Sequence, residues 1–186
     1  MSRLTCMATP LPGLMRIERH RMTDGRGFFS RLFCSSELAA AGWKDRIAQI
    51  NHSHTTHRGT VRGMHYQHPP HTEMKLVSCL QGEVWDVAVD LRKNSPTFLQ
   101  WHAQHLSADN GCALLIPAGF AHGFQALTDN ATLLYCHSAA YASEAEAGIH
   151  PVDPRLAIAW PLPVGSLSPR DAGQAFLAPN FEGVHL

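Results

Sequence analysis

Apolar residues in the middle of the chain gather in short runs, and turn-forming residues separate one run from the next. The runs lie at 74–80, 83–90, 101–106, 112–116, 124–127 and 132–138. Short apolar runs bounded by Gly, Pro, Asn or Ser are typical of β-strands. The pattern therefore predicts a mainly β protein, and the similar spacing of the runs favours an antiparallel sandwich, barrel or jelly roll.

Shorter signals add two local elements to this pattern. The Gln-Gly pair at 81–82 predicts a two-residue hairpin turn between the strands on either side. A short helix is predicted at 36–41, with Ser35 or Ser36 as its N-cap and Gly42 just beyond its end.

Residues 1–186 are expected to form one domain, because the chain has the length of one domain and contains no repeat or linker. We expect the jelly-roll core at about 45–140. The stretch at 150–186 is rich in proline and lacks periodicity, so it is expected to cover the barrel as loops with one or two short helices.

The composition is that of an ordinary globular protein. Hydrophobic residues make up 45% and charged residues 16%, and 15 Lys and Arg balance 15 Asp and Glu, so nothing predicts binding to nucleic acid or an anionic membrane. No run approaches the roughly 20 apolar residues that cross a bilayer, and Pro10 and Pro12 interrupt any secretory signal. The five cysteines are scattered without a C-x-x-C pair, as in reduced proteins. We therefore expect a soluble, cytoplasmic protein.

One motif points to a barrel with a functional mouth. Gly111-x5-Pro117-x-Gly119-x2-His122 predicts a strand, a tight turn and a return strand that directs His122 into the barrel. The spacing is that of the second motif of cupin jelly rolls, except that Ala126 replaces a terminal Asn. Strand-rich cores of this size usually bind small molecules at the barrel mouth.

The 13 histidines point to metal or proton chemistry. A metal-binding cupin also needs a first motif with two His and a Glu, but here His65-x2-His68 has the wrong spacing and Glu73 lies further on. A site for iron, zinc or manganese is therefore the less favoured interpretation. Histidines in polar, turn-like sequence are expected in loops or at the surface: His52, His54, His57, His68 and His71.

His65 is a candidate general base. A single His between apolar residues is more often part of a core, yet proton abstraction next to a carbonyl requires a base with a pKa near 6.5 and a carboxylate partner. Asp171 is a candidate partner, although the residues alone favour a helix start in which Ser168 is the N-cap and Asp171 occupies the first turn. Tyr135 lies in an alternating strand, where core packing is the simpler interpretation.

Arg26 and Arg62 are candidate phosphate contacts. Each of them precedes a glycine, which leaves backbone space for a phosphate beside the guanidinium group. A position on the surface without any ligand explains them equally well.

Motifs in a fixed order resemble the dTDP-4-dehydrorhamnose 3,5-epimerase family. They are DGRGFF at 24–29, QIN at 49–51, VRGMHYQ at 61–67, KLV at 75–77, VDLR at 89–92 with SPT at 95–97, residues 116–124, and LSPRD at 167–171. The resemblance spans about residues 24–171, and the ordered set is far more specific than the cupin motif alone.

The resemblance implies a metal-free jelly-roll homodimer that needs no cofactor and acts on a nucleotide-linked 4-keto-6-deoxy sugar. It implies that His65 is the base, that Asp171 is the carboxylate paired with it, and that Tyr135 is the proton donor on the opposite face of the sugar. It places Lys75 near the keto oxygen, with His122 as a further polar contact there. The implied substrate-binding positions are Arg26, Gln49, Asn51, Arg62, Glu146 and Arg170, the last in place of a Lys that is usual in the family.

The implied reaction is epimerisation at C3, C5 or both. The C4 ketone acidifies the hydrogens on these carbons, and Lys75 would stabilise the enolate that forms. His65 would remove a proton and Tyr135 would deliver another from the far side, which inverts the carbon.

One departure from the family concerns the nucleotide. After the double Phe the family usually has a spacer and then Glu, whereas this chain has Ser30 and Arg31. We expect this reversed charge to shift the preference away from thymidine diphosphate or to alter its pose.

Two other functions remain open. A metal-dependent cupin, such as a dioxygenase or an isomerase, would contain stoichiometric metal. A non-catalytic sugar-binding cupin would bind its ligand without proton exchange. Four residues together argue against it, because binding alone needs no acid–base pair: His65, Tyr135, Lys75 and Asp171.

Overall fold

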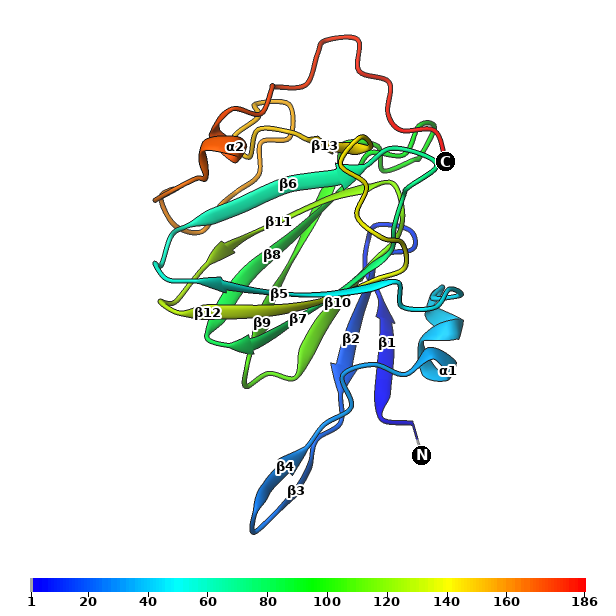
Figure 1. Ribbon diagram of the computed structural model, residues 1–186, viewed down its shortest axis with the longest axis vertical. Helices are drawn as coiled ribbons and strands as arrows, with labels where there is room; N and C mark the ends of the chain where they lie inside the picture. Colours follow the sequence, from blue (N-terminus) through cyan, green and yellow to red (C-terminus); the bar gives the residue numbers. More distant parts are fainter. Residues whose placement is uncertain (1) are drawn as a thin grey trace.

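Two antiparallel sheets face each other in the computed structural model, which describes residues 2–186 (Figure 1). The six-stranded sheet contains, in spatial order, β1 (Leu4–Ala8), β2 (Met15–Arg19), β10 (Cys112–Ile116), β7 (Lys75–Gln81), β12 (Ala131–His137) and β5 (Gln49–Thr55). The five-stranded sheet contains β13 (Glu146–Gly148), β6 (Val61–Gln67), β11 (Phe120–Ala126), β8 (Glu83–Asp90) and β9 (Trp101–Ser107). The prediction of a mainly β, antiparallel jelly roll is confirmed.

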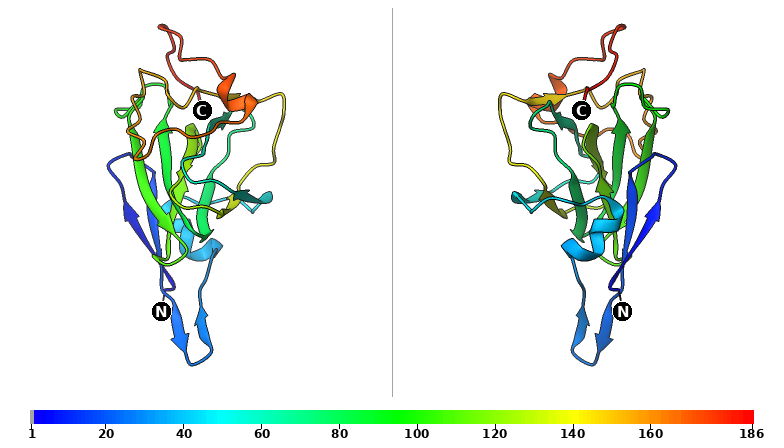
Figure 2. Two further views of the ribbon diagram at one scale, coloured as in Figure 1. Left: turned by 90° about the vertical axis from the view of Figure 1, so that its left-hand side faces the viewer. Right: turned by 90° about the vertical axis from the view of Figure 1, so that its right-hand side faces the viewer.

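Four strands precede the predicted core. β1 and β2 extend the six-stranded sheet, while β3 (Met22–Asp24) and β4 (Gly27–Phe29) form a hairpin that projects from one end of the molecule (Figure 2). Only Leu4 in β1 and Ile17 in β2 are buried, and no residue of the hairpin is. The apolar pattern of these strands is therefore too sparse to predict them.

The predicted hairpin at 81–82 is wrong. β7 pairs with β10 and β12, whereas β8 pairs with β9 and β11, so the chain crosses from one sheet to the other at this point. Gly82 permits the crossing with a φ of +69°, and a Cβ there would lie 2.4 Å from Thr128 Oγ1. Strands that follow one another in sequence usually pair, so a hairpin was the expected connection. Two consecutive strands show the same apolar pattern when they belong to different sheets, and the pattern therefore does not reveal the crossing.

The short helix forms where it was predicted, as α1 (Ser35–Leu38) followed by the 3₁₀ turn η1 (Ala39–Ala41). Gly42 ends it with a left-handed φ of +104°. The predicted serine N-cap is wrong, because Cys34 occupies that position and no side chain caps the helix.

Apolar side chains from both sheets fill the space between them. Leu114 and Leu133 from one sheet and Phe124 from the other are almost completely buried there. A second cluster covers the outer face of the five-stranded sheet, where Leu156 and Val184 of the C-terminal segment pack on it.

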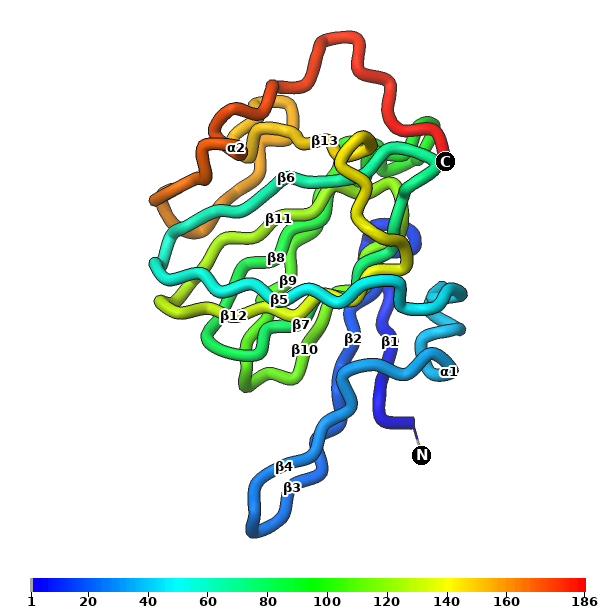
Figure 3. The backbone as a smooth tube through the Cα atoms, in the orientation of Figure 1, coloured from blue at the N-terminus to red at the C-terminus, as the bar shows by residue number. Residues whose placement is uncertain are grey.

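The C-terminal segment runs over this outer face as loops with one short helix, α2 (Pro169–Ala172) (Figure 3). Gln125, fully buried on β11, holds the segment in place: its side-chain nitrogen donates to Leu162 O at 3.0 Å and its oxygen accepts from Leu162 N at 3.0 Å. Within residues 2–186, no helix is long and apolar enough to cross a membrane.

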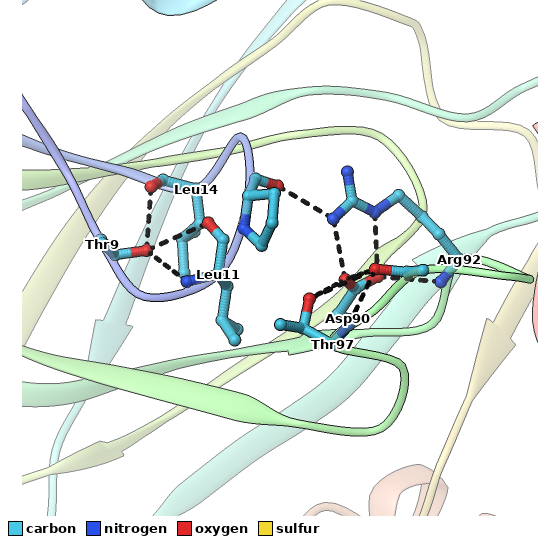
Figure 4. A network of polar contacts seen from close by, with 8 residues as sticks. Thr9, Leu11, Leu14, Asp90, Arg92 and Thr97 are labelled. Carbon is cyan, nitrogen blue, oxygen red and sulfur yellow. Dashed lines mark hydrogen bonds and ion pairs between the residues drawn. The ribbon is translucent and has the colours of Figure 1, made fainter.

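A buried carboxylate fixes the turn after β8 (Figure 4). Asp90 accepts hydrogen bonds from Arg92 Nε at 2.9 Å, Ser95 Oγ at 2.5 Å and Thr97 Oγ1 at 2.7 Å, and Arg92 also donates to Pro12 O at 2.9 Å. Burial opposes ionisation, but these hydrogen bonds outweigh it and hold the pKa of Asp90 below its usual value. The VDLR and SPT motifs therefore stabilise the fold.

Candidate active site

A cavity of about 520 Å³ opens between the two sheets. Strands β5, β7 and β12 line it from one sheet, β6 and β11 line it from the other, and residues 166–171 border it. Ten of the eleven predicted site residues line this cavity: Gln49, Asn51, Arg62, His65, Lys75, His122, Tyr135, Glu146, Arg170 and Asp171.

His65 and Asp171 form a close pair at the cavity wall. His65 Nε2 lies 2.6 Å from Asp171 Oδ1, and the Asp171 side chain is almost completely buried. Burial raises the pKa of Asp171, but hydrogen bonds from His65, Gly63 N and Ser168 outweigh it, so the pKa lies below its usual value. The capping interpretation also holds, because Ser168 Oγ caps α2 by accepting from Asp171 N at 3.0 Å. The backbone of Asp171 takes part in the cap, which leaves its carboxylate free to pair with His65.

A second histidine–carboxylate pair lies beside the first. His122 stands opposite His65 in the β6–β11 register, and its Nε2 is 2.8 Å from Oδ1 of the fully buried Asp86. No motif in the sequence predicts a role for Asp86. A charged residue inside an apolar strand needs a buried partner, and that signal could have found it.

Tyr135 is held on several sides. Its hydroxyl lies 3.0 Å from Ser53 Oγ, and its ring contacts those of His122 and His137 at centroid distances of 6.0 and 6.1 Å. Burial raises the pKa of Tyr135 well above its usual value, and nearby Asp86 adds to this effect. The phenol therefore remains protonated at neutral pH.

Lys75 and His137 face each other across neighbouring strands, β7 and β12. Lys75 Nζ forms an ion pair with Glu73 at 3.0 Å. Burial, followed by the charges of Lys75 and His122, lowers the pKa of His137 to about 4, so this imidazole is neutral at pH 7. Neither Glu73 nor His137 is predicted from the sequence as part of a proton-transfer site.

Polar side chains at the rim are bonded to one another. Glu146 pairs with Arg170 and accepts a hydrogen bond from Tyr141 Oη at 2.8 Å. Gln49 accepts from Tyr141 N at 3.0 Å and donates to Asn51 at 3.0 Å. The rim is therefore preorganised by contacts within the chain.

Arg62 lies on β6 at the same rim. Its Nε donates to Thr55 Oγ1 at 3.0 Å and one terminal nitrogen donates to His54 O at 2.9 Å. The guanidinium group keeps further donors, and Arg62 lines the cavity.

A family model described as dTDP-4-dehydrorhamnose 3,5-epimerase matches residues 8–179. The chain belongs to this epimerase family. It is an isomerase of the dTDP-4-dehydrorhamnose 3,5-epimerase type.

Relatives of the epimerase family are similar over nearly the full length. The dTDP-4-dehydrorhamnose 3,5-epimerase of Shigella flexneri is 41% identical over 180 residues, which cover 96% of this chain and 99% of that protein. The dTDP-4-dehydrorhamnose 3-epimerase of Streptomyces niveus is 40% identical, with 90% and 81% covered. The crystal structure of the 3,5-epimerase of Legionella pneumophila Philadelphia 1 in complex with dTDP-4-keto-L-rhamnose has a TM-score of 0.88 and 43% identity, with 93% and 92% covered.

Of the eleven predicted site residues of this epimerase, Arg26 alone does not line the cavity. It lies in the turn between β3 and β4, almost fully exposed, and pairs with Asp24 at 2.6 Å. Figure 1 shows this hairpin extending away from the two sheets. Arg31, just beyond the hairpin, pairs with Glu37 of α1, which balances its charge within the chain.

The metal interpretation finds no geometric support in this epimerase. Among residues 2–186, no group of three or more His, Cys, Asp or Glu is placed to hold a metal ion. His65 and His122 each direct Nε2 at a carboxylate, and His68 lies exposed beyond the end of β6.

Proposed function

We propose that the protein epimerises a dTDP-linked 4-keto-6-deoxy sugar at C3, C5 or both. The observation that carries the proposal is the His65–Asp171 pair at 2.6 Å, which lines the same cavity as Tyr135 and Lys75. A base, a separate acid and a cation around one cavity are what inversion through an enolate requires. The dTDP-sugar names of the relatives support this substrate class.

His65 acts as the base. The pKa of Asp171 is low, so its carboxylate is ionised and can only accept a hydrogen bond. Nε2 of His65 must therefore carry the proton that it shares with Asp171, and Nδ1 is left with a free lone pair. That nitrogen takes the hydrogen from the carbon next to the ketone.

Lys75 stabilises the enolate, and Tyr135 completes the inversion. A well-placed donor to a developing oxyanion contributes roughly 3–4 kcal/mol. Tyr135 stays protonated because burial raises its pKa, so it holds a proton to deliver to the face opposite the base. This sequence of proton transfers uses no redox cofactor and no metal ion.

Solvent-deuterium labelling tests the function. The protein is incubated in deuterated water with dTDP-4-keto-6-deoxyglucose, and NMR locates the deuterium in the sugar. We expect label at C3, at C5 or at both, together with inversion at the labelled carbon. A sugar that returns without deuterium, at an enzyme concentration that saturates binding, would rule the proposal out.

The nucleotide is a separate question. Arg31, in place of the Glu that is usual in the family, is the reason to expect a nucleotide preference other than thymidine diphosphate. Its ion pair with Glu37 reduces the positive charge that a nucleotide would meet there. Calorimetry of the protein and of Arg31→Glu with dTDP and with UDP measures the effect. If the protein binds dTDP much more tightly than UDP, and Arg31→Glu leaves this difference unchanged, then Arg31 does not determine which nucleotide is bound.

We further propose that the protein is a cytoplasmic homodimer. Its five cysteines are free thiols, and three of them are buried, which suits a reducing compartment. The hairpin carries two exposed phenylalanines, Phe28 and Phe29, with 60% and 62% of their surface in solvent. A second copy that covers this hairpin would also bring Arg26 to a substrate.

A further inference from the structure

Glu73 lines the active cavity just before β7, two residues ahead of Lys75, the first residue of that strand. Its Oε1 lies 3.0 Å from Lys75 Nζ, and Gln67 Nε2 donates a hydrogen bond to Oε2. Only 7% of the Glu73 side chain and 10% of the Lys75 side chain are exposed. Because both groups are buried, removal of either charge would leave the other buried without a partner.

The carboxylate is itself fixed in place. Gln67 is anchored by Ala142 N, which donates to its oxygen at 2.7 Å, and by His71 O, which accepts from its nitrogen at 2.9 Å. Glu73 therefore lies between a rigid amide on one side and a flexible lysine on the other.

Lys75 has little else to hold it. Within residues 2–186, the other hydrogen bond of its ammonium group is to His65 O at 3.5 Å, the limit of such a contact. Across the β7–β12 pair Lys75 faces the imidazole of His137, and within the described residues its one ion pair is with Glu73. A lysine on a four-carbon stem without an anionic partner would leave such a site for the solvent at the cavity mouth.

We propose that Glu73 is a positioning residue that holds the Lys75 ammonium where the enolate oxygen forms. The inference rests on the proposed function. Stabilisation of an oxyanion depends on a donor that is already in place when the charge develops, so a displaced Lys75 loses most of its effect.

A simple electrostatic role for Glu73 predicts the opposite result. An anion 3.0 Å from Lys75 weakens the field of the ammonium at the enolate. If Glu73 did no more than this, its removal would speed the reaction. A fall in kcat when the charge of Glu73 is removed therefore indicates that Glu73 positions Lys75, and a rise indicates that it only weakens the field of Lys75.

The test compares Glu73→Gln, which keeps the volume and removes the charge, with Glu73→Asp, which keeps the charge. Glu144→Gln is the matched control, because Glu144 is exposed and lies no nearer than 3.9 Å to its ion-pair partner His71. We expect Glu73→Gln to lower kcat roughly 10- to 100-fold, below the 10²–10³-fold loss of a donor itself, with KM little changed. Glu73→Asp should recover part of the loss and the control should match wild type. An unchanged or raised kcat in Glu73→Gln would overturn the proposal, as would equal losses in the Gln and Asp variants.

A second readout does not depend on turnover. The chain has only three lysines, Lys44, Lys75 and Lys93, so ¹⁵N-lysine labelling gives three ammonium signals that single Lys→Met variants assign. Glu73→Gln should shift the Lys75 signal and speed its exchange with water, while Glu144→Gln leaves it alone. If Glu73→Gln changes neither the shift nor the exchange rate of the Lys75 signal, the proposal that Glu73 holds the Lys75 ammonium group is wrong. A wild-type protein that is inactive on every sugar would contradict only the proposed function.

Discussion

His65 Nε2 and Asp171 Oδ1 lie 2.6 Å apart, although 106 residues separate the two along the chain. His65 lies on β6, an inner strand of the five-stranded sheet, and Asp171 lies on the four-residue helix α2 in the C-terminal segment. The pair fixes which ring nitrogen of His65 is free, and the first prediction concerns this choice.

Asp171→Asn should reverse the tautomer of His65. The amide can donate to Nε2, which moves the ring proton to Nδ1 and removes the lone pair with which Nδ1 acts as the base. We expect the rate of solvent-deuterium uptake into the sugar to fall about 10²–10⁴-fold with the fold intact. Glu182→Gln, a carboxylate-to-amide change at an exposed ion pair, is the control. Asp171→Asn with wild-type uptake would show that the pair is structural.

The base and the acid should give different signatures. His65→Ala should abolish both epimerisation and exchange, because no enolate forms without the base. Tyr135→Phe should impair inversion more than exchange, since the base can still return a solvent-derived proton to the same face. Loss of a positioned acid commonly costs 10²–10⁴-fold, so chiral analysis and mass spectrometry of one reaction mixture suffice. Inversion at the wild-type rate in Tyr135→Phe would pass the role of acid to another group, with Tyr141 of the rim as the next candidate.

Acid should destabilise the fold through His137. Its pKa is lowered from 6.5 to about 4 by burial and by the charges of Lys75 and His122, so between these values the unfolded chain binds a proton that the folded chain does not. This contribution is fully present above pH 6.5 and is lost as the pH falls toward 4. Thermal unfolding at pH 7.0 and at pH 4.5 measures it. His137→Gln should lose less in Tm between the two values than wild type, and equal losses would contradict the assignment.

Arg26 should act on the substrate of the partner. Arg26→Ala and His65→Ala homodimers should each be nearly inactive. When the two are unfolded together and refolded, mixed dimers contain one site with an intact His65 and an Arg26 supplied by the partner. Activity should therefore return toward about a quarter of wild type, the share of intact sites expected for random pairing with a swapped hairpin. No recovery, in a preparation shown by light scattering to be dimeric, would place Arg26 in its own site or in none.

The positions of the strands in the middle of the chain could be predicted from the sequence better than the pairing between them. Gly and Pro turns delimit β7 to β12 clearly, but nothing in the run before Gly82 shows that β7 and β8 belong to different sheets. The strands before residue 45 bury one side chain in β1 and one in β2, so their pattern is too weak to detect.

The site was predictable only where a motif carried it. Asp171 alone favoured a helix cap, and only the resemblance paired it with His65. Asp86 and His137 contact their partners across neighbouring strands, and such contacts depend on a register that the sequence does not reveal. Glu73 lies only two residues before Lys75, but nothing in the sequence shows that both side chains are buried.

The anchoring of the C-terminal segment by Gln125 has a consequence for synthesis of the protein. Every strand of both sheets precedes residue 149, while Asp171 arrives on a segment that reaches the barrel only through contacts such as those of Gln125 with Leu162. A nascent chain on the ribosome can therefore complete its sheets while His65 still lacks its carboxylate. Asp171 is the last of the cavity residues to be synthesised, and a messenger truncated before codon 171 would encode a chain whose His65 lacks its carboxylate.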